Sequence, residues 1–419
     1  MQDTATPELP YAPGAILCDT AAHLRKLAEA WRHIRRRRAA GEPLHNVSGL
    51  ERGLPLPDDL DPRLIDDEWA GALYADRVRD LGLAHLGGTA GRHDVFVANR
   101  LTAALYAAMQ VTVRPGSTVV GVSATHSHPA VVRAVRDAGG RFYDTAGVTE
   151  FEAALRAHSD VSVVALTRLA VTYDALAEPD LRRVVEIAHA RGAVVVVDDA
   201  GGARVGPAVL GQPRTLELDA DLGATGLDKY GVRGPRVGLL GGRGDLVARA
   251  RARAFELGGE CRPALYPAVA RSLEGYRPDL VRELVASARR VGTALRDRLG
   301  ADLVKDTPFI SLLPGAAIGA ELRRRATPTS ATSRVDLVPI EATAALAMVL
   351  LRDYGLLTVH FAGLPPGTAD LLIKFLPAAT VAAVGGPAAF AAAVDEALDE
   401  TAGALGDHDS LRRLLFGAT

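Results

Sequence analysis

The sequence predicts an α/β protein: a three-layer sandwich around a mainly parallel central sheet, with a smaller α+β domain at its C-terminal end. Two observations carry this prediction. From residue 93 onward, short apolar runs alternate with helical stretches, as in chains whose parallel strands are joined by helices. The run 193–197 is apolar at every position, which indicates a strand that is covered on both faces.

The chain is longer than one typical domain, and its composition is that of a globular protein. It has 419 residues, of which 48% are hydrophobic and 23% charged. Residues 1–40 predict an amphipathic helical arm that ends in the basic run 35–38, and 41–67 shows no periodic pattern. We therefore expect a helical arm with an irregular connection over 1–70, a large domain over 71–300 and a small domain over 301–419.

The elements of the two domains follow from the apolar pattern. In the large domain we expect strands at 95–97, 117–122, 161–167 and 193–197, and helices at 102–110, 129–138 and 179–191. The chain is then expected to be helical from about 243 to 300. In the small domain we expect strands at 310–313, 334–339, 356–361 and 370–375, and helices at 342–354 and 387–405.

Charge and cysteine content exclude several classes of function. The formal net charge of -2 provides no basic field for holding nucleic acid. The two cysteines, Cys18 and Cys261, are too few for a disulfide framework or a four-cysteine zinc site. Neither a membrane-spanning apolar run nor a signal-peptide pattern is evident. We expect a cytoplasmic protein that binds neither nucleic acid nor membranes.

Ligands of open α/β sheets bind beyond the carboxyl ends of the strands, so the polar residues that follow each strand are the candidate site. These are Asn99, Arg100, Leu101 and Thr102, then His126 and His128, then 172–174, then Asp198, Asp199 and Ala200, and finally Asp228 and Lys229. Each also has a purely structural interpretation. Thr102 or His128 would cap a helix, Asp198 would be an ordinary strand-end acid, and Lys229 would be a loop cation.

Together these residues fit the requirements of pyridoxal phosphate. An acid after the most buried strand can keep a heteroaromatic nitrogen protonated, and a histidine can stack on the ring. A helix N-terminus can hold a phosphate, and a lysine can form an imine, which arginine cannot. Only four of the 48 basic residues are lysines (Lys26, Lys229, Lys305 and Lys374), and Lys229 lies in a glycine-rich loop. These are the parts that let this cofactor act as an electron sink.

Three segments resemble those of fold-type I pyridoxal-phosphate enzymes, over about residues 85–270. The stretch 172–200 resembles the segment that ends in the acid beside the cofactor nitrogen, and 119–132 resembles the one that carries the stacking histidine. The loop 227–238 resembles the lysine loop of the selenocysteine synthase (seryl-tRNA selenium transferase) branch and of its sugar-acid ammonia-lyase relatives. Asn46-Val47-Ser48-Gly49 is similar to the opening motif of that branch.

The resemblance implies an aminotransferase-like large domain and a role for each site residue. Lys229 would hold the cofactor as an internal aldimine and shuttle a proton, Asp198 would partner the pyridine nitrogen, and Ala200 would pack on the ring. His128, or otherwise His126, would stack on it. The remaining cofactor-binding residues would be Asn99, Arg100, Leu101, Thr102 and Asp228. Two departures stand out: Arg100-Leu101-Thr102 replaces a Gly-Thr or Gly-Ser phosphate loop, and Gly201-Gly202 replaces the usual histidine after the acid.

The lysine loop favours elimination or replacement at the β-carbon of an amino-acid-type substrate. Transamination and decarboxylation use the same parts and stay open. The substrate carboxylate would bind Lys374, which otherwise extends to solvent, or Arg262. The resemblance also implies a homodimer or higher oligomer.

Two alternative functions lie outside the pyridoxal-phosphate enzymes. A Rossmann dehydrogenase would need a G-x-G-x-x-G turn after its first strand, which neither 87–91 nor 231–238 provides. A non-catalytic scaffold on the same fold is the other alternative. We expect no metal, since His126 and His128 two residues apart are a weak metal signal.

Overall fold

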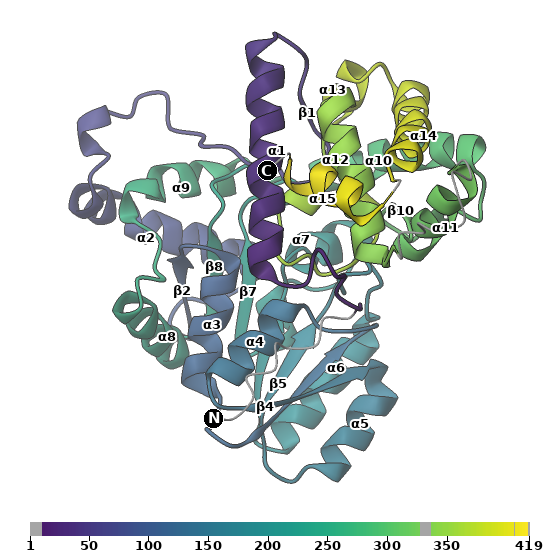
Figure 1. Cartoon of the computed structure of the whole chain (residues 1–419). Coiled ribbons are helices and arrows are strands. Elements are labelled where there is room, and N and C mark those ends of the chain that lie inside the picture. Colours follow the sequence, from purple (N-terminus) through teal and green to yellow (C-terminus); the bar gives the residue numbers. More distant parts are fainter. Residues whose placement is uncertain (1–10, 327–336, 406, 418–419) are drawn as a thin grey trace. The chain divides into compact units, whose positions relative to one another are not determined.

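The computed structural model describes residues 11–326, 337–405 and 407–417 (Figure 1). These residues form two compact units. One consists of the chain up to Leu50 together with Glu283 onward, and the other runs from Glu51 to Arg282. We call them the terminal unit and the central unit. Each is described separately below.

The central unit contains a seven-stranded sheet in the order β2-β8-β7-β6-β5-β3-β4. Only β8 runs antiparallel to its neighbours, β2 and β7, so the prediction of a mainly parallel sheet is confirmed. The strands are β2 (His93–Ala98), β3 (Thr118–Ser123), β4 (Arg141–Ala146), β5 (Val161–Thr167), β6 (Val194–Asp198), β7 (Leu222–Gly226) and β8 (Gly238–Arg243).

Helices cover both faces of this sheet, which gives the expected three layers (Figure 1). Apolar residues of α3, α4 and α8 pack on one face, while those of α5 and α6 pack on the other. The helices are α2 (Asp67–Leu86), α3 (Leu101–Thr112), α4 (Pro129–Asp137), α5 (Gly147–Ala157), α6 (Glu178–Ala190), α7 (Gly202–Val205), α8 (Gly244–Glu256) and α9 (Tyr266–Glu274). Short 3₁₀ or π turns lie at Pro62–Leu64, Gly206–Leu210, Thr215–Leu218 and Pro263–Leu265.

The sequence pattern did not predict β4, β7 or β8, for identifiable reasons. Of the six residues of β4 only Thr145 is buried, so this strand at the sheet edge lacks an apolar run. The glycines of β8 are not typical of a strand, but they belong to one that packs closely. A Cβ at Gly241 would lie 2.6 Å from Cδ1 of Leu86, and one at Gly242 would lie 2.1 Å from the carbonyl oxygen of Asp221. Glycine is required there by neighbouring atoms.

The terminal unit is built around α12, which is buried along almost its whole length. Its helices are α1 (Thr20–Ala39), α10 (Pro278–Leu299, whose first residues belong to the central unit), α11 (Gly315–Arg325), α12 (Pro339–Tyr354), α13 (Ala378–Ala383), α14 (Pro387–Ala404) and α15 (His408–Phe416). The strands β9 (Lys305–Asp306), β10 (Ser311–Leu313) and β12 (Leu371–Ile373) form an antiparallel sheet. The strands β1 (His45–Asn46) and β11 (Leu356–Leu357) form a parallel pair.

Two of the four strands predicted for the small domain are confirmed, as β10 and β12. The predicted strand 356–361 is a strand only at Leu356–Leu357 and continues as a 3₁₀ turn, Val359–Phe361. Most of the predicted strand 334–339 lies outside the described residues. Within its described part, Pro339 begins α12 instead, because proline is favoured at the first turn of a helix.

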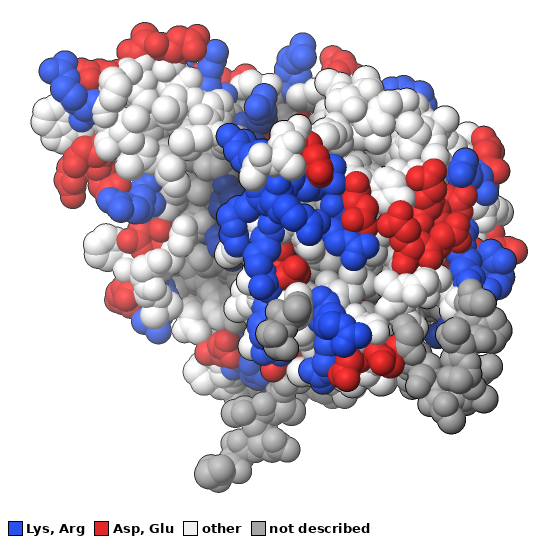
Figure 2. Space-filling view, turned by 45° about the horizontal axis from the view of Figure 1, so that its top comes forward, with Lys and Arg blue, Asp and Glu red and all other residues white. Residues whose placement is uncertain are grey.

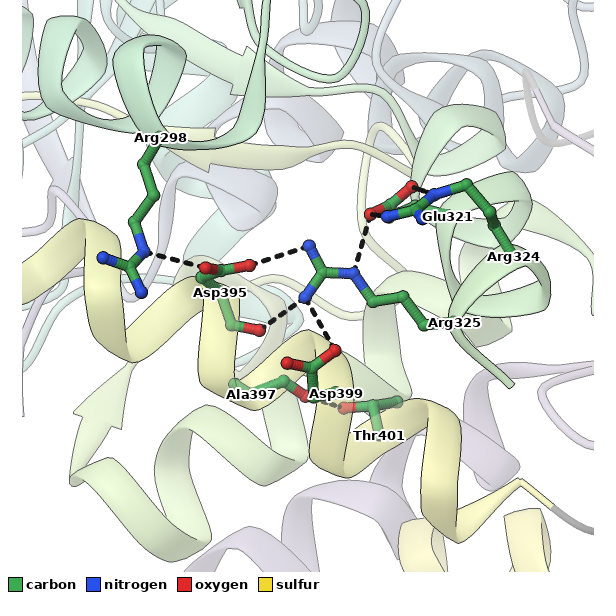
Figure 3. Close-up of polar contacts among 8 residues, drawn as sticks. All are labelled: Arg298, Glu321, Arg324, Arg325, Asp395, Ala397, Asp399 and Thr401. Atoms are coloured by element: carbon green, nitrogen blue, oxygen red, sulfur yellow. Dashed lines mark hydrogen bonds and ion pairs between the residues drawn. The ribbon is translucent and has the colours of Figure 1, made fainter. Parts of the chain in front are cut away.

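The terminal unit contains a network of ion pairs around Arg325 (Figure 3). The guanidinium of Arg325, at the end of α11, lies 2.7 Å from Glu321, 2.7 Å from Asp395 and 3.0 Å from Asp399. Arg298 of α10 pairs with the other oxygen of Asp395 at 2.8 Å. Every guanidinium nitrogen of Arg325 therefore contacts a carboxylate, and the network joins three helices.

The basic run at the end of α1 is only partly a solvated helix end. Arg35, Arg36 and Arg38 are exposed. Arg37 is buried, and its guanidinium donates to the carbonyl oxygens of Arg352 and Asp353 at 2.8 and 2.9 Å. Figure 2 shows the basic and acidic side chains on one face of the molecule. No helix in the described part of the chain is both long and apolar enough to cross a membrane.

Candidate functional site

The strand ends of the central unit bring Asp198 and the Lys229 loop to one edge of the sheet. Asp198 is the last residue of β6, and it pairs in parallel register with Ala224 of β7. Lys229 follows β7 after a three-residue step, and a Cβ at Gly226 would lie 3.0 Å from its Nζ. The lysine side chain thus folds back over the strand end, and glycine leaves room for its amine.

Asp198 is a buried carboxylate that lacks part of its hydrogen bonding. It is 6% exposed, and its Oδ1 has no hydrogen-bond partner among the described residues. Burial raises its pKa to about 6, while the charge of Lys229 and the backbone N–H of Ala200 act in the opposite direction. A buried acceptor of this kind is costly unless a donor arrives. The protonated nitrogen of a pyridine ring is such a donor.

The neighbouring carboxylate, Asp199, differs in having a paired cation, although its Oδ1 likewise has no hydrogen-bond partner among the described residues. Its Oδ2 lies 3.0 Å from a guanidinium nitrogen of Arg168, and both side chains are almost completely buried. The hydroxyl of Thr215 donates to the same oxygen at 2.7 Å. Gly202 makes room for this group, since a Cβ there would lie 2.2 Å from Asp199 Oδ1. Asp199 is therefore a structural residue, and Asp198 remains the candidate for the ligand.

Lys229 is a cation whose surroundings favour loss of its proton. Burial is the main cause that lowers its pKa; Arg204 and Arg236 lower it further, whereas Asp228 and Asp198 oppose the shift. Its Nζ lies 3.8 Å from Asp228 Oδ1, and one fifth of the side chain is exposed. A lysine with a lowered pKa that remains accessible is suited to form an imine with an aldehyde.

His128 caps α4, which is the structural role that the sequence left open. Its Nδ1 accepts a hydrogen bond from the backbone N–H of Ala130 at 3.0 Å. Burial lowers its pKa to about 4, with additional effects of Arg133, Lys229 and His126. At neutral pH the ring is therefore uncharged, with its hydrogen on Nε2. Stacking of His128 on a cofactor ring stays a prediction.

The N-terminus of α3 offers an anion site, although Thr102 is not its N-cap. Arg100 is the N-cap residue and makes no side-chain capping bond, so Leu101 and Thr102 are the first two residues of the helix. The first N–H groups of a helix have no partner within it, and they attract anions. The backbone N–H of Asn99 is already bonded to the carbonyl of Gly259 at 2.8 Å. Leu101, Thr102 and Arg100 are the better candidates of this group.

Two further arginines, Arg236 and Arg52, were not singled out from the sequence, and Arg236 lies within electrostatic range of both Arg100 and Arg52. Burial and the charges of Arg100 and Arg52 lower the pKa of Arg236 to about 10. Arg52 also lies 3.5 Å from Asp228 through its Nε. A guanidinium group within electrostatic range of two others is typical of a site for a multiply charged anion. Arg236 was visible as the second arginine of the 227–238 loop, whereas Arg52 had no sequence signal.

The segment that was predicted to be irregular begins by pairing with the lysine loop. The N–H of Glu51 donates to the carbonyl of Asp228 at 2.9 Å, and that of Gly53 to the carbonyl of Gly234 at 3.0 Å. The Glu51 carboxylate accepts from the N–H of Gly231. These bonds hold Arg52 beside the loop. In the terminal unit, Asn46 and Ser48 form a local turn in which the Ser48 hydroxyl donates to Asn46 Oδ1 at 2.6 Å.

A buried arginine connects two of the strand-end loops. Arg204 is fully buried and donates to the carbonyl oxygens of Ala200 and Gly226, each at 2.9 Å. It fixes Ala200 next to Asp198 and fixes the end of β7 before Lys229. No sequence pattern distinguishes it in a chain rich in arginine.

The two cations predicted for a substrate carboxylate lie in different units. Lys374 follows β12 in the terminal unit and is only 4% exposed, so the alternative that it extends to solvent is wrong. A Cβ at Gly49 would lie 2.5 Å from the Lys374 carbonyl oxygen. Arg262, in the central unit, is exposed and pairs with Asp67 at 2.6 Å. In the described part of the chain, no group of three or more His, Cys, Asp or Glu side chains is arranged to hold a metal ion.

Comparison with curated proteins identifies relatives of similar length. The chain is 31% identical over 376 residues to a UPF0425 pyridoxal phosphate-dependent protein of Methanothermobacter thermautotrophicus, which covers 89% of this chain and 92% of the relative. It is 26% identical over 326 residues to the protein of the same description in Methanosphaera stadtmanae, with 77% and 80% coverage. A comparison with profiles of known protein families finds no match.

Solved structures share the fold. Aspartate aminotransferase from Thermotoga maritima superimposes with a TM-score of 0.53 over 88% of this chain and 96% of its own, at 14% identity. The aspartate aminotransferase of Rhizobium meliloti gives the same TM-score and coverage at 16% identity. The aminotransferase-like fold that the sequence predicted is thereby confirmed.

Proposed function

Because this chain belongs to the UPF0425 family of pyridoxal phosphate-dependent proteins, we propose that it is an enzyme that links pyridoxal phosphate to Lys229. The proposed reaction is lyase-like: elimination or replacement at the β-carbon of an amino-acid-type substrate. The lysine loop 227–238 supports this choice through its resemblance to the selenocysteine synthase branch. When bound, the cofactor supplies an electron sink for negative charge that develops at the α-carbon.

The observation that carries the proposal is the unpartnered Oδ1 of Asp198 at the end of β6. This buried acceptor lies within electrostatic range of Lys229, the residue that would bear the covalent link. A pyridine nitrogen and an aldehyde on one ring would satisfy both groups. The residues present therefore fit the cofactor of the family.

The other groups of the site divide the remaining tasks. The N–H groups at the start of α3, with Arg100 and Arg236, would hold the phosphate. The uncharged His128 would lie against the ring. Lys229, whose pKa is lowered mainly by burial, would take the proton from the α-carbon and return it.

The proposal also names a substrate contact and an assembly. Lys374 or Arg262 would bind the substrate carboxylate, and the protein would form a homodimer or a higher homo-oligomer. Substitution of Lys374 by methionine should raise KM for the substrate far more than it changes the affinity for the cofactor. Light scattering on the eluting protein gives the oligomeric state directly.

Visible absorption and product analysis test the proposed function. The purified protein should show a yellow band that shifts when an amino acid is added. Released ammonia together with an oxo acid, in the absence of an amino acceptor, would establish elimination. Dependence on an added oxo acid would replace it with transamination, and released carbon dioxide would replace it with decarboxylation. A colourless protein that cannot be reconstituted with pyridoxal phosphate would leave only the non-catalytic scaffold.

A further inference from the structure

A tyrosine directly after Lys229 occupies a turn position that usually holds glycine or asparagine. Tyr230 has φ 47° and Gly231 has φ 90°, and the N–H of Val232 donates to the carbonyl of Lys229 at 3.1 Å. This is a β-turn with positive φ at both central residues, for which Asn-Gly is the common sequence. A residue with a Cβ is strained in this conformation. Tyr230 must therefore be present for its side chain.

A second tyrosine shows the same departure in the loop after β5. Tyr173 has φ 66°, and its N–H donates to the carbonyl of Ala170 at 2.9 Å. The N–H of Ala170 in turn donates to the carbonyl of Asp174 at 2.9 Å, and Leu169 and Ala175 pair as an antiparallel bridge. Tight loops of this kind place a residue in the left-handed region, where glycine is usual.

The two tyrosines meet side chain to side chain. Their hydroxyl oxygens lie 2.5 Å apart, and the residues are 6% and 3% exposed for Tyr173 and Tyr230. Two strained backbone positions that support one buried contact are a sign of function rather than of turn formation.

The ring of Tyr230 also explains one departure from the resembling family. A Cβ at Gly201 would lie 2.2 Å from Cε2 of Tyr230. Gly201 has φ -123°, which any residue can adopt, so only the ring requires glycine there. Gly201 is the first of the two glycines that stand where the usual histidine after the acid is missing. The ring of Tyr230 thus fills space next to the backbone that follows Asp198.

We propose that the Tyr173–Tyr230 pair positions Lys229 for its link to the cofactor. This inference rests on the proposed function. The pair joins the loops after β5 and β7, and the ring rests on the loop after β6. Because Tyr230 adjoins Lys229 in a tight turn, fixing the tyrosine ring fixes the direction in which the lysine side chain leaves the backbone. The tyrosines act through Lys229 and are positioning residues.

The test compares Tyr230→Phe, Tyr173→Phe and the double variant, which keep both rings and remove the bond between the hydroxyls. Each single variant should weaken pyridoxal phosphate binding about three- to tenfold, measured by absorbance titration. Each should also shift the pH at which the cofactor band changes. The double variant should be no weaker than the singles, because the same bond is removed. Tyr106→Phe, which removes a hydroxyl bond to Asp137 of 2.9 Å in the same unit, is the matched control.

Tyr230→Asn relieves the turn but removes a buried ring, so the melting temperature of the cofactor-free variant should fall, and cofactor binding should weaken more than in Tyr230→Phe. The Tyr→Phe variants, which keep the rings, separate positioning from folding. If the band depends on Lys229 and all these variants bind and titrate like wild type, the inference is overturned alone. If the wild-type band survives Lys229→Ala, the proposed function is overturned and the inference falls with it.

Discussion

The ion-pair network around Arg325 and the strand-end site around Asp198 differ in how completely their charged groups are paired. In the network, the three guanidinium nitrogens of Arg325 contact three carboxylates at 2.7 to 3.0 Å (Figure 3). In the site, Asp198 Oδ1 has no partner among the described residues, and Lys229 is 3.8 Å from its nearest carboxylate oxygen. The network joins helices through ion pairs, whereas the site has a buried oxygen that is able to accept a hydrogen bond from a ligand.

The same contrast occurs between two adjacent residues. Each has an Oδ1 without a hydrogen-bond partner among the described residues, but Asp199 is paired through Oδ2 with Arg168 and Thr215, whereas Asp198 has no such ion pair there. Asp198 ends β6 and lies near Lys229, whereas Asp199, the next residue, packs against Arg168. A buried carboxylate without an ion pair is therefore a better marker of the site than burial or an unpartnered oxygen alone, because both aspartates have the latter two features.

The largest effect should come from Asp199→Asn. This change leaves the buried guanidinium of Arg168 without its counter-charge, and it should cost about 3–5 kcal/mol of unfolding free energy. Asp198→Asn removes a carboxylate that burial already disfavours, so it should cause no loss of stability at pH 7. Urea unfolding of the cofactor-free variants measures both. Equal losses of unfolding free energy for the two variants would contradict the different roles given to Asp198 and Asp199.

Arg325→Met should have a smaller effect, about 1–3 kcal/mol of unfolding free energy, because the network is only partly buried. The loss should be confined to the terminal unit, as hydrogen exchange of α11 and α14 would report. Arg324→Met, whose guanidinium is mostly exposed and pairs with Glu321 alone, should cost much less. A variant of Arg325 as stable as wild type would show that the network does not stabilise the fold.

Arg236→Gln should weaken pyridoxal phosphate binding about tenfold, since one charge-assisted contact to the phosphate is lost. The affinity for pyridoxal, which has no phosphate, should not change. Absorbance titration with the two aldehydes makes the comparison. An equal loss for both would move Arg236 out of the phosphate site.

The smallest expected effect on stability is that of lowering the pH. Hydrogen bonds from Arg324, with the charge of Arg325, lower the pKa of Glu321 from 4.5 to about 2. The folded state therefore binds fewer protons than the unfolded state across this range. The contribution of Glu321 to stability is complete above about pH 4.5 and is lost as the pH falls towards 2. Glu321→Gln should flatten the pH dependence of the melting temperature in this window; an unchanged slope would contradict the assignment.

The sequence predicted the parts of the molecule that local pattern determines. Strands with continuous β-branched runs, such as Val194–Asp198, were found within a residue, and so was the edge of the sheet where the polar residues gather. The strand Gly238–Arg243 was not predicted. Glycine is required in it because atoms of α2 and β7 approach too closely for a side chain, and these contacts are not visible in the sequence.

The candidate site was predictable where a residue type has a distinctive chemistry. Lys229 and Asp198 belong to that class. Arg52, Arg204 and Arg236 do not, because arginine is the common cation of this chain and only tertiary contacts distinguish them. The tyrosine pair was hidden for a different reason: its signal lies in backbone conformation, which the residue letters do not carry.

Borohydride reduction followed by peptide mass spectrometry tests the central claim most directly. The protein reconstituted with pyridoxal phosphate should carry one reduced pyridoxyl group on the peptide that contains Lys229, and Lys229→Ala should carry none. Attachment at Lys26, Lys305 or Lys374 in the wild-type protein, with Lys229 unmodified, would contradict the account.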